Sequence, residues 1–251
     1  MRVLGSGADV VVFVHGWMVS SAVFAPIEAK LGLTGRRLAF VDLPGAGARR
    51  DDAGPFTIDA FVASVVAALD ALGADDAIVV GHSMGGQLAL ALAARHPKRV
   101  RAVCAVTPVP LSGLALDGGA RAMFASAGGD RAALRRIVDM ATKALSDEAK
   151  DALVDDAMTV SPACVAASLD AWTAGVAAPA NETRAIVAPT LVAATDDAFL
   201  PPALLQREIV DVVKGARLSH IPGVGHYPQW EAPAELADVI NRFLAEHRSH
   251  R

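Results

Sequence analysis

The 251 residues are 53% hydrophobic and 20% charged, a composition that is too apolar for a disordered chain. Lys and Arg number 23 against 27 Asp and Glu, and this net charge of −4 argues against nucleic-acid binding, which needs a basic surface. No apolar run reaches the ~20 residues of a membrane-spanning helix, and the N-terminal segment lacks the apolar stretch of a signal peptide. We therefore expect a cytoplasmic globular protein with no membrane or nucleic-acid partner.

Strand-like and helix-like segments alternate along most of the chain. Short β-branched runs predict strands, and longer segments bounded by capping residues such as Ser21 and Thr57 predict helices. In chain order, we expect a strand over 10–14, a helix over 22–33, a strand over 38–41, a helix over 58–72, a strand over 77–80, a helix over 84–96, strands over 100–106 and 190–194, a helix over 202–213, a strand over 218–221 and a helix over 234–247. This alternation favours an α/β fold, in which a mostly parallel sheet carries helices on both faces.

One long segment, residues 111–185, interrupts the alternation. It contains no convincing strand and is Ala-rich, with glycine pairs and Pro162 as punctuation. Its helical patches are expected over 120–125, 131–145, 147–158 and 162–173. We interpret 111–185 as a helical lid over the carboxyl ends of the strands, inserted in a core formed by 1–110 and 186–251. Extra helices on one face of the sheet are the alternative.

A Gly-x-Ser-x-Gly motif, Gly81-His82-Ser83-Met84-Gly85, lies between an expected strand and an expected helix. Glycines on both sides of Ser83 permit a tight turn that exposes its hydroxyl at the carboxyl edge of the sheet. The amide of Met84 then lies at a helix N-terminus, where a developing oxyanion is favoured. This context indicates a nucleophilic serine.

Four motifs together carry a family resemblance. They are Val14-His15-Gly16-Trp17, Asp42-Leu43-Pro44-Gly45-Ala46-Gly47, Gly81-His82-Ser83-Met84-Gly85 and Gly225-His226. With these motifs in this order, the sequence resembles the α/β-hydrolase superfamily, and within it the small serine carboxylesterases with a helical lid. Only 14 residues precede His15, so the opening antiparallel hairpin of that fold is expected to be shortened or missing.

A serine nucleophile needs a base and a carboxylate that orients the base. Of the seven histidines, His226 lies in the loop just after the last expected strand, where it can project over the sheet, and His220 is the weaker candidate. In this fold the acid lies between the serine and the histidine in the chain. The resemblance selects Asp197, with the adjacent Asp196 as the alternative.

The resemblance also implies that the Trp17 amide joins the Met84 amide in an oxyanion hole. We therefore expect a serine hydrolase that cleaves small carboxylic esters through an acyl-enzyme. The same groups would serve a C–C bond, lactone or thioester hydrolase, a cofactor-free peroxidase or lyase, or a ligand-binding relative without turnover, because fold alone does not choose among chemistries.

Metal and nucleotide sites are not indicated. Cys104 and Cys164 lie 60 positions apart, and no metal-binding or phosphate-binding motif follows a strand, so we expect no cofactor and no metal. Arg131, Arg135 and Arg136 cluster on one expected lid helix. They are candidates to grip a substrate carboxylate or an acidic carrier protein, although a solvated helix face is the simpler interpretation.

Overall fold

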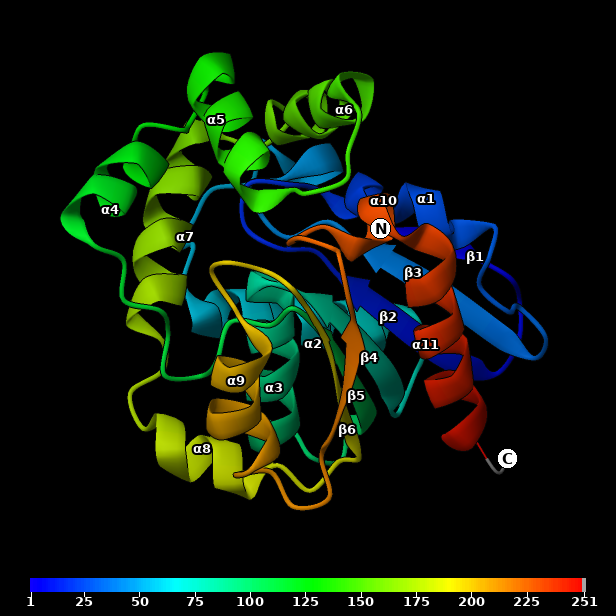
Figure 1. Ribbon diagram of the computed structural model, residues 1–251. Helices are drawn as coiled ribbons and strands as arrows, with labels where there is room; N and C mark the ends of the chain where they lie inside the picture. Colours follow the sequence, from blue (N-terminus) through cyan, green and yellow to red (C-terminus); the bar gives the residue numbers. More distant parts are fainter. Residues whose placement is uncertain (250–251) are drawn as a thin grey trace.

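The computed structural model describes residues 1–249, and within these residues seven strands form one sheet in the order β1-β3-β2-β4-β5-β6-β7 (Figure 1). Every pairing is parallel except that of β1 with β3. The strands are β1 (Arg2–Leu4), β2 (Asp9–Val14), β3 (Arg36–Val41), β4 (Ala77–His82), β5 (Val100–Val106), β6 (Thr190–Thr195) and β7 (Arg217–Ile221). The predicted mostly parallel sheet is confirmed.

The expected shortening of the N-terminal hairpin takes a specific form. β1 has three residues and pairs antiparallel with β3 rather than with its chain neighbour β2. The chain therefore starts with one short antiparallel edge strand.

Helices cover both faces of the sheet, as predicted. α3 (Met84–Arg95) packs on β4 and β5 and contacts α2 (Ile58–Ala71), whereas α11 (Pro233–Glu246) packs on β6 and β7 beside α1 (Ala25–Glu28). The remaining short helices outside 111–178 are η1 (Ser21–Phe24), η2 (Gly47–Arg49), α8 (Pro179–Ala185), α9 (Pro202–Leu205), η3 (Gln206–Val210) and α10 (Pro228–Glu231). The α8 and α10 helices were not expected from the sequence.

The helix expected over 22–33 is wrong. Ser20, not Ser21, caps a short 3-10 turn by accepting a hydrogen bond from the Ala22 amide at 3.1 Å, and α1 follows as a single turn. Pro26 explains the break, because its missing N–H cannot donate to the carbonyl four residues earlier, at Ala22. A continuous helix from residue 22 is therefore excluded.

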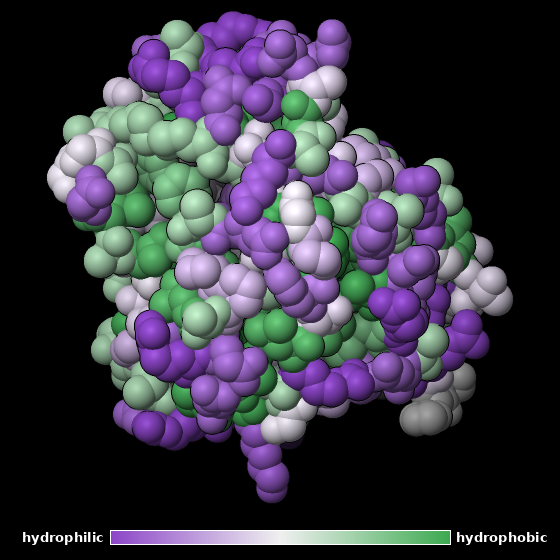
Figure 2. Space-filling model, in the orientation of Figure 1, coloured by the Kyte–Doolittle hydropathy of each residue, from purple (hydrophilic) through white to green (hydrophobic). Residues whose placement is uncertain are grey.

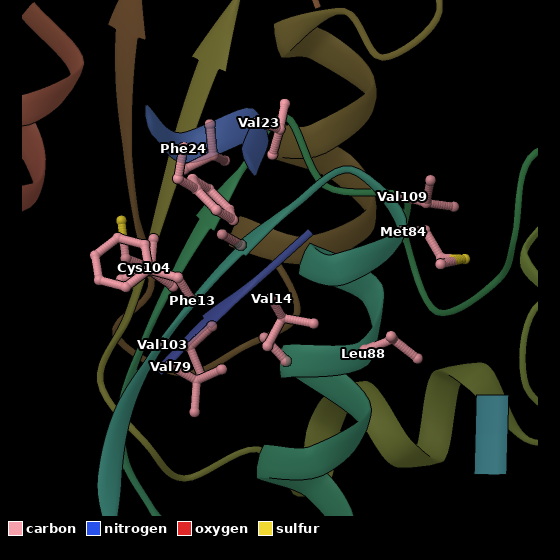
Figure 3. Packing of buried hydrophobic residues seen from close by; sticks show 14 of the residues in the cluster. Phe13, Val14, Val23, Phe24, Val79, Met84, Leu88, Val103, Cys104 and Val109 are labelled. Atoms are coloured by element: carbon pink, nitrogen blue, oxygen red, sulfur yellow. The ribbon is translucent and has the colours of Figure 1, made fainter. Parts of the chain in front are cut away.

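The hydrophobic core lies between the central strands and their helices. β2 and β4 are buried along their whole length, as expected for parallel strands covered on both faces. The Phe13 ring stacks on Phe40 at 4.6 Å between centroids and meets Phe24 edge-on at 5.3 Å. Figure 3 shows part of this core, with Phe13, Val79 and Leu88 labelled. The core fixes the strand ends from which the site is built.

Four helices form an insertion between β5 and β6, which we call the α4–α7 insertion. They are α4 (Gly118–Ala125), α5 (Arg131–Ala141), α6 (Asp147–Ala157) and α7 (Pro162–Ala174). They lie together at the top and left of Figure 1, whereas α8 packs against α3. The helix expected over 131–145 ends at Ala141, because Thr142 adopts an extended conformation.

Within residues 1–249, no single helix is long and apolar enough to cross a membrane. The consecutive helices α6 and α7 meet the same criteria only as a pair, bent by 96°.

Candidate active site

Ser83 occupies a strained turn between β4 and α3, with φ 56° and ψ −119°. The flanking glycines are required by close backbone contacts. A Cβ at Gly81 would lie 2.2 Å from the Gly85 carbonyl oxygen, and one at Gly85 would lie 2.1 Å from that of Val14. The predicted tight turn is therefore present, and larger side chains at these two positions are sterically excluded.

Backbone strain gathers at the carboxyl edge of the sheet. Among residues 1–249, the non-glycine residues with positive φ are Met18, Ser83 and Thr107, which follow β2, β4 and β5. Such conformations cost about 1–3 kcal/mol each and concentrate at functional sites. Strain therefore points to the same edge as the serine motif.

The loop after β2 passes directly beside this turn. A Cβ at Gly16 would lie 3.0 Å from the Ser83 Cβ, so glycine permits the close approach that brings the Trp17 segment to the serine. Met84 begins α3, and its N–H therefore has no acceptor within the helix. Both segments expected to supply oxyanion donors, at Trp17 and Met84, therefore adjoin the Ser83 turn.

His15 fastens this loop to its neighbour. Its Nε2 accepts a hydrogen bond from the Leu43 amide at 3.0 Å, so Nδ1 carries the proton and donates to the Gly16 carbonyl at 2.9 Å. Burial lowers the pKa of His15, which keeps the ring neutral as these bonds require. His15 therefore holds two loops together and is not available as a base.

Asp197 and His226 are in contact. The Asp197 Oδ2 and His226 Nδ1 atoms lie 2.5 Å apart, and the other carboxylate oxygen accepts from the Phe199 amide at 2.9 Å. Burial alone would raise the pKa of Asp197, which is 2% exposed, but the His226 imidazole and the backbone amides outweigh burial and hold it below its ordinary value. An ionised Asp197 therefore orients the His226 ring, leaving Nε2 as the free nitrogen.

The alternative pair, Asp196 and His220, lies elsewhere. The Asp196 Oδ1 and His220 Nε2 atoms are 2.7 Å apart, and both side chains are more than one third exposed. The Gly223 amide donates to the second Asp196 oxygen at 2.7 Å, and this hydrogen bond lowers the pKa of the carboxyl most strongly. This pair secures the turn after β7 and takes no part in the cavity described below.

The backbone of His226 is held from two sides. Its N–H donates to the Ala141 carbonyl at the end of α5, at 2.7 Å. Its carbonyl accepts from His82 Nε2 at 2.8 Å and from the Thr107 hydroxyl at 3.4 Å. Burial, reinforced by the His226 imidazole, lowers the pKa of His82 to about 3, so its ring is neutral and the proton lies on Nε2. Sequence reasoning missed these contacts.

Ser83 and His226 line one cavity with about 480 Å³ of empty space, its open mouth included. The α4–α7 insertion contributes Phe124 to an aromatic cluster at this cavity, in which Phe124 stacks 5.3 Å from Trp17 and meets Phe199 at 5.6 Å. The lining consists of Trp17, Met18, Ser83, Val109, Leu114, Phe124, Ile137, Ala141, Trp172, Phe199, Leu200, His226 and Tyr227. Among these lining residues there is no Lys, Arg, Asp or Glu, so the cavity suits an uncharged group.

Two arginines of α5 form ion pairs within the insertion. Arg135 contacts Asp139, Asp147 and Asp151, and Arg131 contacts Asp155. Figure 2 shows hydrophilic residues gathered at the top of the molecule, where Figure 1 places α5 and α6. These charges form a solvated, ion-paired surface away from the cavity lining.

No group of three His, Cys, Asp or Glu side chains that could hold a metal ion is found in residues 1–249. The groups that meet at the cavity are the Ser83 hydroxyl and the His226 imidazole with its Asp197 carboxylate. They can perform acyl transfer by a nucleophile and a base.

Comparisons with known proteins identify relatives of this chain. The 2-hydroxymuconate semialdehyde hydrolase of Pseudomonas sp. (strain CF600) is 28% identical over 98% of this chain and 86% of its own length. A pimeloyl-[acyl-carrier protein] methyl ester esterase of Xanthomonas campestris pv. campestris (strain B100) is 40% identical, over 42% of this chain and 40% of its own length.

A solved structure shares the whole fold. The bromoperoxidase from Bacillus anthracis superposes with a TM-score of 0.87, at 21% identity, over 97% of this chain and 94% of its own. Residues 11–239 also match the sequence profile of the alpha/beta hydrolase family. By its sequence, its sheet and its serine turn, this chain belongs to the alpha/beta hydrolase family.

Proposed function

We propose that this protein is a serine hydrolase that cleaves carboxylic esters through an acyl-enzyme. Ser83 is the nucleophile, His226 the general base and Asp197 the carboxylate that orients it. The observation that carries the proposal is the 2.5 Å contact between Asp197 and His226 at a cavity that the strained Ser83 also lines. A triad is recognised by such geometry and by the roles of its members.

The reaction begins when the neutral His226 imidazole takes the Ser83 proton and the serine oxygen attacks the ester carbonyl. The negative charge that develops on the carbonyl oxygen is stabilised by the Trp17 and Met84 amides, and one such donor is worth about 2.7–4 kcal/mol. His226 then gives the proton to the departing alkoxide, which leaves as an alcohol and yields the acyl-enzyme. Asp197 stabilises the imidazolium during both proton transfers.

Water completes the cycle. His226 removes a proton from the water as its oxygen attacks the acyl-enzyme, and the proton returns to Ser83 as the carboxylic acid departs. Because the base must be neutral, activity falls in acid.

The lining of the cavity favours a substrate whose acyl group is small and uncharged. Its lining is apolar and aromatic, and an anionic substrate would lose hydration there without gaining a cationic partner. This argues against a muconate-type carboxylate, which the Pseudomonas relative is named for. A small-molecule ester is also favoured over an acidic carrier protein gripped by Arg131, Arg135 and Arg136, because Arg131 and Arg135 are already ion-paired and Arg136 does not line the cavity.

Covalent labelling tests the nucleophile. A fluorophosphonate probe should modify the wild-type protein, and peptide mapping should place the adduct on Ser83. The Ser83→Ala variant should lose labelling and at least a thousandfold in kcat toward p-nitrophenyl acetate. The matched control Ser126→Ala, at an exposed serine of the insertion, should keep both.

Substrate profiling separates the alternative chemistries. Esters should be turned over in preference to thioesters, enol-lactones, diketones and peroxide-dependent halogenation. A Ser83→Ala protein that retained near-wild-type ester turnover would refute the proposal. Tight ligand binding with negligible turnover would instead identify a binding protein.

A further inference from the structure

Glu231, at the end of α10, accepts four backbone hydrogen bonds that the proposed reaction does not use. Its Oε2 atom accepts from the amides of Lys143, Ala144 and Gly225 at 2.7, 3.0 and 3.1 Å. Its Oε1 atom accepts from the Tyr227 amide at 3.3 Å. Hydrogen bonds to an ionised carboxylate are stronger than those between neutral groups.

These four amides belong to two segments that are distant in the sequence. Gly225 and Tyr227 flank His226, whereas Lys143 and Ala144 follow α5 of the insertion after Thr142. The extended conformation of Thr142 ends α5 and so places the next two amides outside the helix. One carboxylate thus joins the histidine loop to the insertion.

Two further contacts make the junction tight. The His226 amide donates to the Ala141 carbonyl at 2.7 Å. A Cβ at Gly225 would lie 2.4 Å from that same oxygen and 2.9 Å from Glu231 Oε1, so only glycine fits between the two segments. The backbone on both sides of His226 is therefore set by groups of α5 and by Glu231.

We propose that Glu231 is a positioning residue that makes the placement of the His226 imidazole depend on the position of α5. This inference rests on the proposed role of His226 as the base. Without the carboxylate, two amides beside His226 and two beside α5 lose their acceptor, and the loop is held to the insertion less firmly, through the hydrogen bond from the His226 amide to the Ala141 carbonyl. A displacement of about 1 Å at a catalytic group can cost a hundredfold in rate.

Three variants test the proposal. Glu231→Ala removes all four acceptors. Glu231→Gln keeps one carbonyl oxygen, which can serve Lys143, Ala144 and Gly225, but its NH₂ group cannot accept from Tyr227. Glu235→Ala, at an exposed acid in the first turn of α11, is the matched control.

We expect Glu231→Ala to lower kcat tenfold to a hundredfold, on the scale expected of a misplaced catalytic group. The kcat of Glu231→Gln should lie between those of Glu231→Ala and the wild type, and the kcat of Glu235→Ala should equal that of the wild type. Two readouts do not depend on turnover. The downfield proton resonance of His226 Nδ1–H, bound to Asp197, should weaken or move in Glu231→Ala, and hydrogen exchange should accelerate in peptides covering 141–145 and 224–228.

These readouts also separate this inference from the proposed function. If Ser83 proves not to be the nucleophile, the resonance and the exchange rates still report whether Glu231 positions the imidazole. A folded Glu231→Ala protein with wild-type kcat and an unchanged Nδ1 resonance would overturn the inference. If that variant does not fold, Glu231→Gln decides, because wild-type kcat and unchanged exchange at Tyr227 would equally overturn it.

Discussion

His82 makes the stability of the protein depend on pH in a way that can be calculated. Burial, with a contribution from the His226 imidazole, lowers its pKa from 6.5 to about 3. The unfolded chain recovers the ordinary value. Between pH 3 and pH 6.5 the unfolded state therefore binds more protons than the folded state, and the free energy of unfolding must fall as the pH falls.

The size of this effect follows from the two pKa values. Linkage gives a loss of about 2 kcal/mol from His82 alone between pH 7.5 and pH 5. The substitution His82→Gln removes the titrating group but retains an N–H donor that can reach the His226 carbonyl. Over this interval the wild-type protein should therefore lose about 2 kcal/mol more stability than the variant.

Urea unfolding of both proteins at pH 7.5, 6 and 5 provides the measurement. The other titrating groups contribute alike to both proteins and cancel in the difference between them. Parallel stability curves, differing by less than about 0.5 kcal/mol in their pH dependence, would refute the reasoning, since they would mean that folding does not perturb the His82 pKa.

Three other predictions concern the serine turn, a helix cap and the two buried thiols. Gly85→Ala should prevent the serine turn from forming, because its Cβ would lie 2.1 Å from the Val14 carbonyl oxygen, and thermal melting with esterase assays should show lost stability and activity. Thr57→Ala removes the cap that accepts from the Ala60 amide at 3.2 Å, and it should cost about 1 kcal/mol in urea unfolding with no loss of turnover. Burial raises the pKa of Cys104 to about 12 and that of Cys164 to about 11, so both thiols should resist a disulfide reagent at pH 8 until denaturant is added.

The parallel strands were predictable because they are short apolar runs between turn and helix signals, as in the β-branched and aromatic run of β2. Their ends shifted by one or two residues, as between 10–14 and the observed Asp9–Val14. The helix over 22–33 failed in its first turns, where Pro26 separates η1 from α1 against a favourable apolar pattern. A pattern averaged over many residues thus predicts a type of element better than its limits.

In the site, features encoded by adjacent residues were predictable, whereas most contacts between residues that are distant in the sequence were not. The serine turn is encoded within five residues and was recognised from them. Asp196 and Asp197 are adjacent and chemically identical, and the family resemblance selected Asp197 with Asp196 as the alternative; the structure pairs Asp196 with His220 and Asp197 with His226. The contacts of His82 and Glu231 have backbone groups as partners, and a backbone group carries no signal in the sequence.

These contacts change how the α4–α7 insertion should be understood. Its backbone supplies the Ala141 carbonyl to His226 and the Val165 carbonyl to the Trp17 indole, and its Asp156 carboxylate accepts from the Ser20 amide at 2.9 Å. Two loops of the proposed site are therefore held by the insertion as well as by the core. A change in the insertion would therefore alter the position of His226 and of the loop after β2 that carries Trp17, as well as the shape of the cavity. Exchanging it for that of a relative should thus change kcat as well as substrate preference, which a cover that only selects substrates would not do.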